Sequence, residues 1–275
     1  LSDRASASIT YRLENVDISA GSGGIANLGA RSTSLPTTNT ANLFRGGWNS
    51  SIRGSLGWDS RDNRMFPTAG WSTSLYAEYA GRLTASENNF VRWGGFARHY
   101  QRLGDSPFVL RLNGEFGVTT SLDGKGVPLS ERYLLGGIYD IRGYQARSIG
   151  PQLFAQRPGD VGQSLDPLPI GGNAQLIGNA EVEFPISKRM GLSGVAFFDI
   201  GNAFNLENRF CNGSGTTVDA CTPVSGMLGN MRKSVGLGLR WQSPIGPLRL
   251  EWGLPLDLKP GEKSSGLDFT IGTSF

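Results

Sequence analysis

The chain has 275 residues, of which 38% are hydrophobic and 18% are charged, and 40 residues are glycine. A soluble domain of this length usually has a larger apolar core and a more charged surface, so this composition argues against an ordinary globular protein. No run of about 18 apolar residues occurs, which excludes a transmembrane helix. The net charge of +3 is spread along the chain, which disfavours a nucleic-acid-binding protein. If the chain meets a membrane, it does so with strands.

Side chains for catalysis or metal binding are scarce. His99 is the only histidine, and its place between Arg98 and Tyr100 is typical of a strand residue. A serine triad could use only this imidazole, and a cluster of histidine ligands is impossible. We therefore expect neither enzyme activity nor a metal ion or other cofactor.

The two cysteines, Cys211 and Cys221, lie in a polar segment rich in Gly, Asn and Thr. We interpret them as a disulfide that closes a small loop in an oxidising compartment. Two free thiols are the alternative.

A polar turn contains Asp59, Arg61 and Asp62. Such residues could suggest an acid–base pair, but a local hydrogen-bonded clip is the favoured interpretation because aspartates commonly bond to nearby backbone groups in turns.

Apolar and polar residues alternate along much of the chain. This period of two is typical of strands, whereas a helix would repeat every 3.6 residues. The pattern predicts ten strands, at Ala5–Leu13, Ile52–Trp58, Trp71–Tyr79, Phe90–Tyr100, Phe108–Val118, Ala174–Phe184, Leu192–Ile200, Val235–Trp241, Leu248–Leu254 and Leu267–Phe275.

The two faces of these strands differ in a way that predicts a lipid environment. Between Leu248 and Trp252, large apolar residues alternate with Arg249 and Glu251. The polar faces carry Gly, Ser, Asn and isolated charges, as expected around a wet lumen, and lipid requires a closed sheet in which all backbone groups are paired. We predict an all-β fold, a transmembrane antiparallel up-and-down β-barrel. Aromatic girdles at the two interfaces are expected at Trp48, Trp58, Trp71, Trp241 and Trp252.

Connection lengths test this prediction independently. Tight turns at 104–107, 185–188 and 243–246 and a moderate connection at 61–70 alternate with long connections at 14–46, 119–172 and 203–232 and with loops at 81–89 and 257–265. Outer-membrane barrels have short periplasmic turns and longer extracellular loops. If the tight turns are periplasmic, both ends of the ten-strand segment are periplasmic too.

A motif lies in the longest predicted loop, where Gly136-Gly137 is followed by Ile141-Arg142-Gly143-Tyr144. It resembles the (I/V)RG(F/Y) tetrad in the lumen-folded loop of the outer-membrane protein assembly factors named after BamA. The resemblance covers essentially the whole chain. Further stretches agree with this family in order and spacing, at Trp58–Gly70, Glu181–Pro185, Phe197–Asn202 and Gly238–Pro255.

The resemblance implies a place in a larger barrel. Barrels of this family have sixteen strands preceded by periplasmic POTRA modules, and the strands predicted here align with the seventh to the sixteenth. Residues 1–275 would then form the C-terminal part of the barrel, with a lumen-folded loop over about 119–172, and without the POTRA modules and the first strands. Ten strands alone would hardly enclose a lumen that houses so long a loop.

The same resemblance implies a bacterial outer-membrane insertase, which folds and inserts β-barrel clients without ATP through a lateral seam. The implied partners are outer-membrane lipids and lipopolysaccharide, unfolded β-barrel clients and periplasmic accessory lipoproteins, with no nucleic acid. A protein-secreting transporter of the same superfamily, of the two-partner-secretion or TamA-like kind, is the alternative. An unrelated diffusion porin agrees less well with the strand number and the inner carboxylates.

The resemblance also places Arg142 inside the barrel, paired with carboxylates on two adjacent strands. Alternation supports Glu183 and Asp199 as these partners because both lie on the polar faces of their strands. A guanidinium fork can bridge two carboxylates, which lysine cannot match. Gly143 would let the loop approach the wall closely, and Tyr144 would add packing. A solvated surface arginine is the alternative.

The final predicted strand, from Gly266 to the aromatic Phe275, permits two interpretations that are compatible with each other. It could be a plain barrel strand that carries the C-terminal recognition signal of outer-membrane proteins. The family resemblance implies, in addition, one half of a lateral seam that pairs with client strands, formed here by Phe269, Ile271 and Phe275. Gly272 occupies the position where the family's last strand bends inward.

Overall fold

The structure is a computed structural model that describes residues 3–18, 41–155, 166–207, 210, 228–243, 246–259 and 262–272. Ten strands form one sheet in the order β1-β2-β3-β4-β5-β8-β9-β10-β11-β12, and β6 (Gln152–Ala155) pairs with β7 (Asp166–Pro169) inside the long loop. The main strands are β1 Ala5–Val16, β2 Gly47–Asp59, β3 Gly70–Ala80, β4 Phe90–Arg102, β5 Val109–Ser121, β8 Ala174–Ser187, β9 Leu192–Phe204, β10 Arg232–Ser243, β11 Gly246–Pro255 and β12 Leu267–Ile271.

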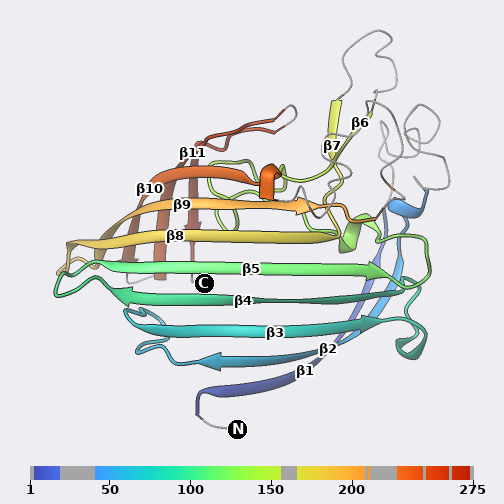
Figure 1. The fold of residues 1–275 in the computed structure, drawn as a ribbon, viewed down its shortest axis with the longest axis horizontal. Helices are drawn as coiled ribbons and strands as arrows, with labels where there is room; N and C mark the ends of the chain where they lie inside the picture. Colours follow the sequence, from blue (N-terminus) through green and yellow to red (C-terminus); the bar gives the residue numbers. More distant parts are fainter. Residues whose placement is uncertain are drawn as a thin grey trace.

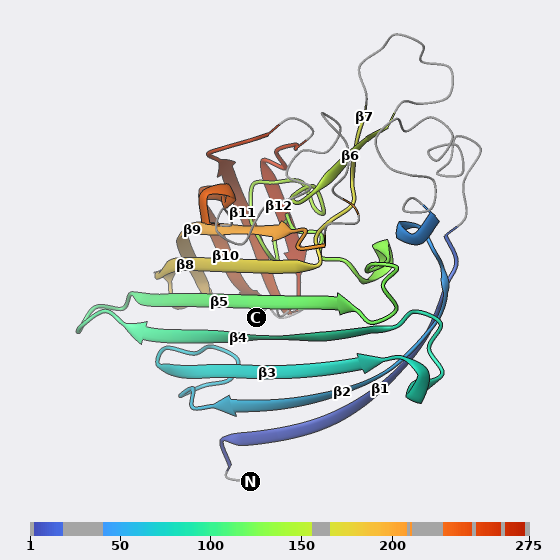
Figure 2. The same ribbon diagram turned by 45° about the vertical axis from the view of Figure 1, so that its right-hand side comes forward.

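Each strand of the main sheet runs antiparallel to the next, which confirms the all-β, up-and-down prediction. Every predicted strand is present, and most extend by a few residues beyond the predicted range. The sheet curls strongly, so that β11 and β12 stand steeply to β3–β5 (Figures 1 and 2). Within the described residues, β1 and β12 form the two edges and each pairs on one side.

Burial in the sheet is inverted relative to a soluble protein. Leu250 and Trp252 are 39% and 52% exposed, whereas Glu251 between them is 0% exposed and Arg249 is also buried. All the tryptophans expected in the aromatic girdles are likewise exposed. Since an exposed apolar belt is unfavourable in water and favourable in hydrocarbon, the outer face is the lipid-facing one. In the described ranges, no helix is long and apolar enough to cross a membrane.

With one exception, the connections alternate in length as predicted. Residues 60–69, 103–108, 188–191 and 244–245 separate strands at one end of the sheet, and residues 17–46, 81–89, 122–173, 205–231 and 256–266 separate them at the other; of the second set, only 81–89 is not longer than every member of the first. The turn expected at 185–188 lies at 188–191, because β8 continues to Ser187 through an irregularity at Pro185. This arrangement agrees with short periplasmic turns and long extracellular loops. His99 lies within β4, as predicted, with its ring 4.2 Å from that of Trp71.

Residues 133–149, within the longest connection (122–173), pack against the inner face of the sheet. In this segment Ile141, Tyr144 and Ile149 form a buried apolar cluster with Ile177 of β8 and Ala203 of β9. The inside of the curved sheet therefore contains both this small apolar cluster and a larger set of buried charged side chains.

Candidate functional site

Arg142 lies on the inner face of the sheet and is 2% exposed. Its Nε and Nη2 donate to the two carboxylate oxygens of Asp199, at 2.7 and 2.6 Å, and its backbone N–H donates to the same carboxylate at 3.0 Å. This is the bidentate geometry in which a guanidinium binds a carboxylate most strongly. The predicted contact between Arg142 and Asp199 is therefore present in the structure.

The third nitrogen of the guanidinium binds two further carboxylates. Nη1 donates to Glu181 on β8 and, at 3.1 Å, to Glu251 on β11. Arg142 thus draws together three strands, because Asp199 lies on β9. The ring of Phe197 packs against the guanidinium, with 3.6 Å between Cζ and the ring centroid.

Two arginines of the wall balance these carboxylates. Arg240 on β10 donates to Glu181 at 2.9 Å and to Glu251 at 3.1 Å, and Arg249 on β11 donates to Glu251 at 2.9 Å. A buried charge is strongly destabilising unless it is paired and hydrogen-bonded. The alternating arginines and carboxylates of this cluster meet that requirement.

The prediction that Arg142 contacts Glu183 is wrong. Glu183 pairs instead with Arg111, at 2.7 Å, and with Arg240, at 3.3 Å. Alternation identifies the face on which a side chain lies but not its depth, and two residues along a strand correspond to about 6.6 Å. Glu181 lies on the same face as Glu183 and at the depth that the loop reaches.

Four members of the site were not predicted from the sequence: Glu181, Arg240, Arg249 and Glu251. The same alternation places Arg249 and Glu251 on the inner face, so the pattern contained a signal for the face of β11. Nothing in the sequence pattern specifies which strands the loop reaches.

Gly143 brings the loop backbone against the wall, as the family resemblance implied. Its φ of +85° favours glycine, and a Cβ at this position would lie 2.7 Å from the carbonyl carbon of Gly253 on β11. The carbonyl oxygen of Gly143 accepts a hydrogen bond from the backbone N–H of Ser265, at 2.9 Å. The loop is thereby bonded to the connection that leads into β12.

Tyr144 packs in the buried apolar cluster, in agreement with its expected packing role. Its hydroxyl lies 2.6 Å from a carboxylate oxygen of Asp257 and 3.1 Å from the carbonyl oxygen of Lys233. The side chain therefore links the loop to β10 and to the connection between β11 and β12.

The last strand lies at one edge of the described sheet. β12 pairs with β11, and its Phe269 and Ile271 are exposed on the outer face. Gly272, which follows the strand, has a φ of +116°, and its N–H donates to the carbonyl oxygen of Pro247 at 2.8 Å. Phe275 and the predicted disulfide between Cys211 and Cys221 lie outside the described residues.

The polar turn between β2 and β3 forms the predicted clip. Arg61 donates to both carboxylate oxygens of Asp59. Desolvation opposes ionisation of Asp62, but hydrogen bonds from the Thr68 hydroxyl and from the backbone N–H groups of Thr68 and Ala69 outweigh it, so that the pKa of Asp62 falls to about 2. The ionised carboxylate therefore holds the turn closed.

We expect this turn to open in acid. An unfolded aspartate has a pKa of about 3.9, so the stabilisation by Asp62 is complete above about pH 4 and is lost as the pH falls toward about 2. Hydrogen exchange at the amides of Thr68 and Ala69 measures the effect, and the amide of Ser106, bonded to a backbone carbonyl in another turn, is the control. The expectation would be contradicted if the protection of the Thr68 and Ala69 amides changed no more than that of the Ser106 amide over this pH range.

An antiparallel sheet with an apolar outer face, a polar inner face and an inner loop seated by a buried arginine defines the wall of a transmembrane outer-membrane β-barrel. Comparison with known families agrees: the Omp85 superfamily domain matches residues 1–275, and the chain belongs to this superfamily. Its location is the outer membrane.

Several relatives of this chain are named as outer membrane protein assembly factors. The chain is 30% identical over 219 residues to the outer membrane protein assembly factor BamA of Nitratidesulfovibrio vulgaris (79% of this chain, 24% of that protein) and 27% identical over 256 residues to that of Neisseria meningitidis (87% and 30%). A SAM50-like protein of Schizosaccharomyces pombe is 29% identical, over 82% of this chain and 45% of that protein. The chain thus spans less than half the length of these relatives.

Among solved structures, BamA from Haemophilus ducreyi lacking POTRA domains 1-3 matches with a TM-score of 0.66 and 25% identity. The match covers 84% of this chain and 44% of the other. The same barrel fold is therefore shared over most of the described strands.

Proposed function

We propose that this chain is the C-terminal wall of a barrel that folds and inserts β-barrel proteins into the outer membrane. The superfamily match and the relatives named as assembly factors support this role. The observation that carries it here is the seating of Arg142 on carboxylates of three strands, because this fixes the long loop on the inner face.

In the proposed mechanism, β12 is one half of a lateral seam. Within the described residues its outer edge is unpaired, and an unpaired strand edge can template another strand by backbone hydrogen bonds. Phe269 and Ile271 would keep the seam in contact with lipid while a client strand adds to this edge. The free energy would come from the client, whose backbone groups become paired as it enters the bilayer, so the reaction needs neither ATP nor a covalent intermediate.

The partners of the whole protein follow from this proposal. They are unfolded β-barrel clients, the lipids and lipopolysaccharide around the seam, and accessory lipoproteins on the periplasmic side. No enzyme activity, cofactor or nucleic acid is required.

The proposal is tested with the full-length protein that contains this chain. The protein is reconstituted in phospholipid vesicles without nucleotide, a urea-denatured client barrel is added, and the folded client is measured by its heat-modifiable mobility in gels. We expect client folding to be accelerated by at least about tenfold over empty vesicles, which corresponds to about 1.4 kcal/mol in the barrier. Vesicles containing an unrelated porin are the control for nonspecific bilayer defects.

Two results would contradict the proposal. A folding rate equal to that with the porin would exclude assistance of insertion. Release of the client into the vesicle interior, without membrane integration, would favour the secretion transporter instead.

A further inference from the structure

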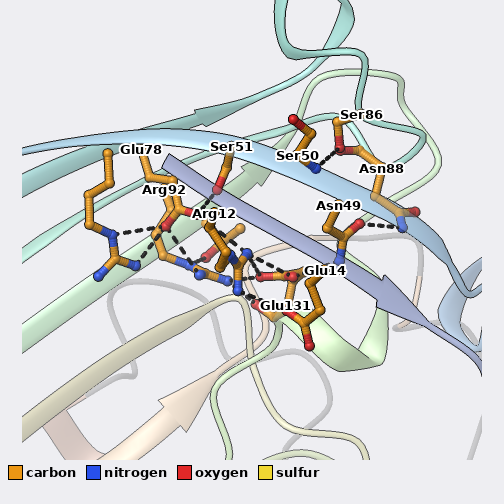
Figure 3. A network of polar contacts seen from close by, with 12 residues as sticks. Arg12, Glu14, Asn49, Ser50, Ser51, Glu78, Ser86, Asn88, Arg92 and Glu131 are labelled. Carbon is orange, nitrogen blue, oxygen red and sulfur yellow. Dashed lines mark hydrogen bonds and ion pairs between the residues drawn. The ribbon is translucent and has the colours of Figure 1, made fainter. Parts of the chain in front are cut away.

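A second buried polar cluster lies on the inner face of β1–β4, away from Arg142. Its centre is Glu131, which is 3% exposed and ends the short 3-10 helix η3 (Leu129–Glu131) near the start of the long loop. Figure 3 shows this carboxylate among side chains from β1, β2 and β4.

Three side chains of the wall bind Glu131. Arg12 on β1 donates through Nη2 to both carboxylate oxygens, each at 3.0 Å, and Asn49 on β2 donates at 2.8 Å. Arg92 on β4 donates to the carboxylate at 2.6 Å and to the backbone carbonyl of Glu131 at 2.9 Å. The contacts thus fix both the side chain and the backbone of the loop at this residue.

The wall is organised to receive this carboxylate. Glu78 on β3 accepts hydrogen bonds from Ser51 and Arg92 (Figure 3) and from Arg53. It therefore holds the arginine side chains in place and balances part of their charge. Without Glu131, the buried Arg92 would lose its closest carboxylate contact. A buried guanidinium that loses its closest carboxylate destabilises the folded protein.

The two clusters have opposite polarity. At Glu131 the loop supplies the carboxylate and the wall the arginines, whereas at Arg142 the loop supplies the arginine and the wall the carboxylates. The two residues bind separate parts of the sheet, β1, β2 and β4 in one case and β8, β9 and β11 in the other. The segment from 131 to 142 therefore connects the two sides of the curved wall.

We propose that Glu131 is a positioning residue, and that residues 131–142 form a brace whose oppositely charged ends tie β1–β4 to β8–β11. The brace holds Arg142 at its carboxylates and fixes the curvature of the wall. Its value to the protein rests on the proposed function, because a wall that opens at the edge of β12 needs a fixed shape elsewhere.

The test compares E131Q with E14Q. Glu14 accepts a hydrogen bond from the same Arg12 but lies in β1 and is half-exposed, so E14Q makes the same chemical change without touching the loop. The full-length variants are treated with trypsin, and cleavage after the exposed Arg147 of the loop is followed by mass spectrometry. Retention of heat-modifiable mobility shows that the barrel is still folded.

We expect cleavage after Arg147 to be at least about tenfold faster in E131Q than in the parent protein. E14Q should match the parent, and E131D should restore most of the protection because it keeps the charge. R92Q should also accelerate cleavage in the parent background, and the effects of R92Q and E131Q should be less than additive, since the two residues share the contact between the Arg92 guanidinium and the Glu131 carboxylate. Equal cleavage in E131Q and E14Q would overturn the proposal.

Two further outcomes keep the test decisive. If E131Q yields no folded barrel, R92Q carries the comparison with E14Q, and unchanged cleavage in R92Q overturns the brace. Client insertion is measured separately: faster loop cleavage with unaltered insertion supports the brace and counts against the role of the loop in the proposed function.

Discussion

Replacement of Arg142 by alanine is expected to release the long loop from the wall. The substitution removes the contacts to Asp199, Glu181 and Glu251. Removal of one partner from a buried ion pair typically costs about 3–5 kcal/mol because the remaining charge stays buried. The loss of stability should come mainly from the unpaired Asp199, since Glu181 and Glu251 keep contacts with Arg240.

Hydrogen exchange of the loop segment 133–150 measures this effect, and client insertion should fall in parallel. R142K is the matched control: it keeps the charge but loses the fork, so we expect exchange much closer to R142A than to the parent. In the double variant R142A/D199N, part of the protection should return because the unpaired carboxylate is gone. Parent-like exchange in R142K would show that charge alone, and not the fork, seats the loop.

Replacement of Gly253 by alanine is expected to displace the loop without changing any charge. A Cβ on Gly253 would come within 2.5 Å of the Cα of Gly143 and 2.8 Å of the carbonyl carbon of Arg142. These are backbone atoms, so the contact cannot be relieved by rotating a side chain. Overpacking of this kind costs about 1–3 kcal/mol, and here the cost falls on the docking of the loop.

G114A is the control for Gly253, because Gly114 also lies within a strand and an added Cβ there meets no atom within 4 Å. The same exchange measurement on segment 133–150 should show faster exchange in G253A and no change in G114A. Faster exchange in both variants would mean that glycine loss in any strand disturbs the loop, and the close approach would then have no special role.

The strands were predictable because their pattern is local. Alternation between Leu248 and Trp252 depends on which face meets lipid, and the structure confirms the predicted faces. The pair β6–β7 was not predicted: each strand has four residues, and Asp166–Pro169 contains two prolines, which are unusual in strands. Such a short pairing depends on contacts within the loop and leaves no periodic signal.

The site was predictable in part. The motif around Arg142 and the parity of Asp199 predicted one contact that the structure contains. The choice between Glu181 and Glu183 depends on how deep the loop lies, which is set by the approach of Gly143 to Gly253 and by other contacts distant in sequence. The cluster around Glu131 was not predicted for the same reason, since its members come from four strands and the loop.

The inverted burial of the sheet has a consequence for how this protein tolerates genetic variation. Outward residues such as Leu250 meet fluid hydrocarbon, where one aliphatic shape replaces another at little cost. Inward residues such as Arg240 meet fixed donors and acceptors, so even lysine is a poor substitute. In a saturation-mutagenesis survey, conservative substitutions should reduce function most at the inward ionic positions. Substitutions among aliphatic residues at the outward positions should have little effect. A water-soluble enzyme usually shows the reverse, because its apolar residues form the packed core.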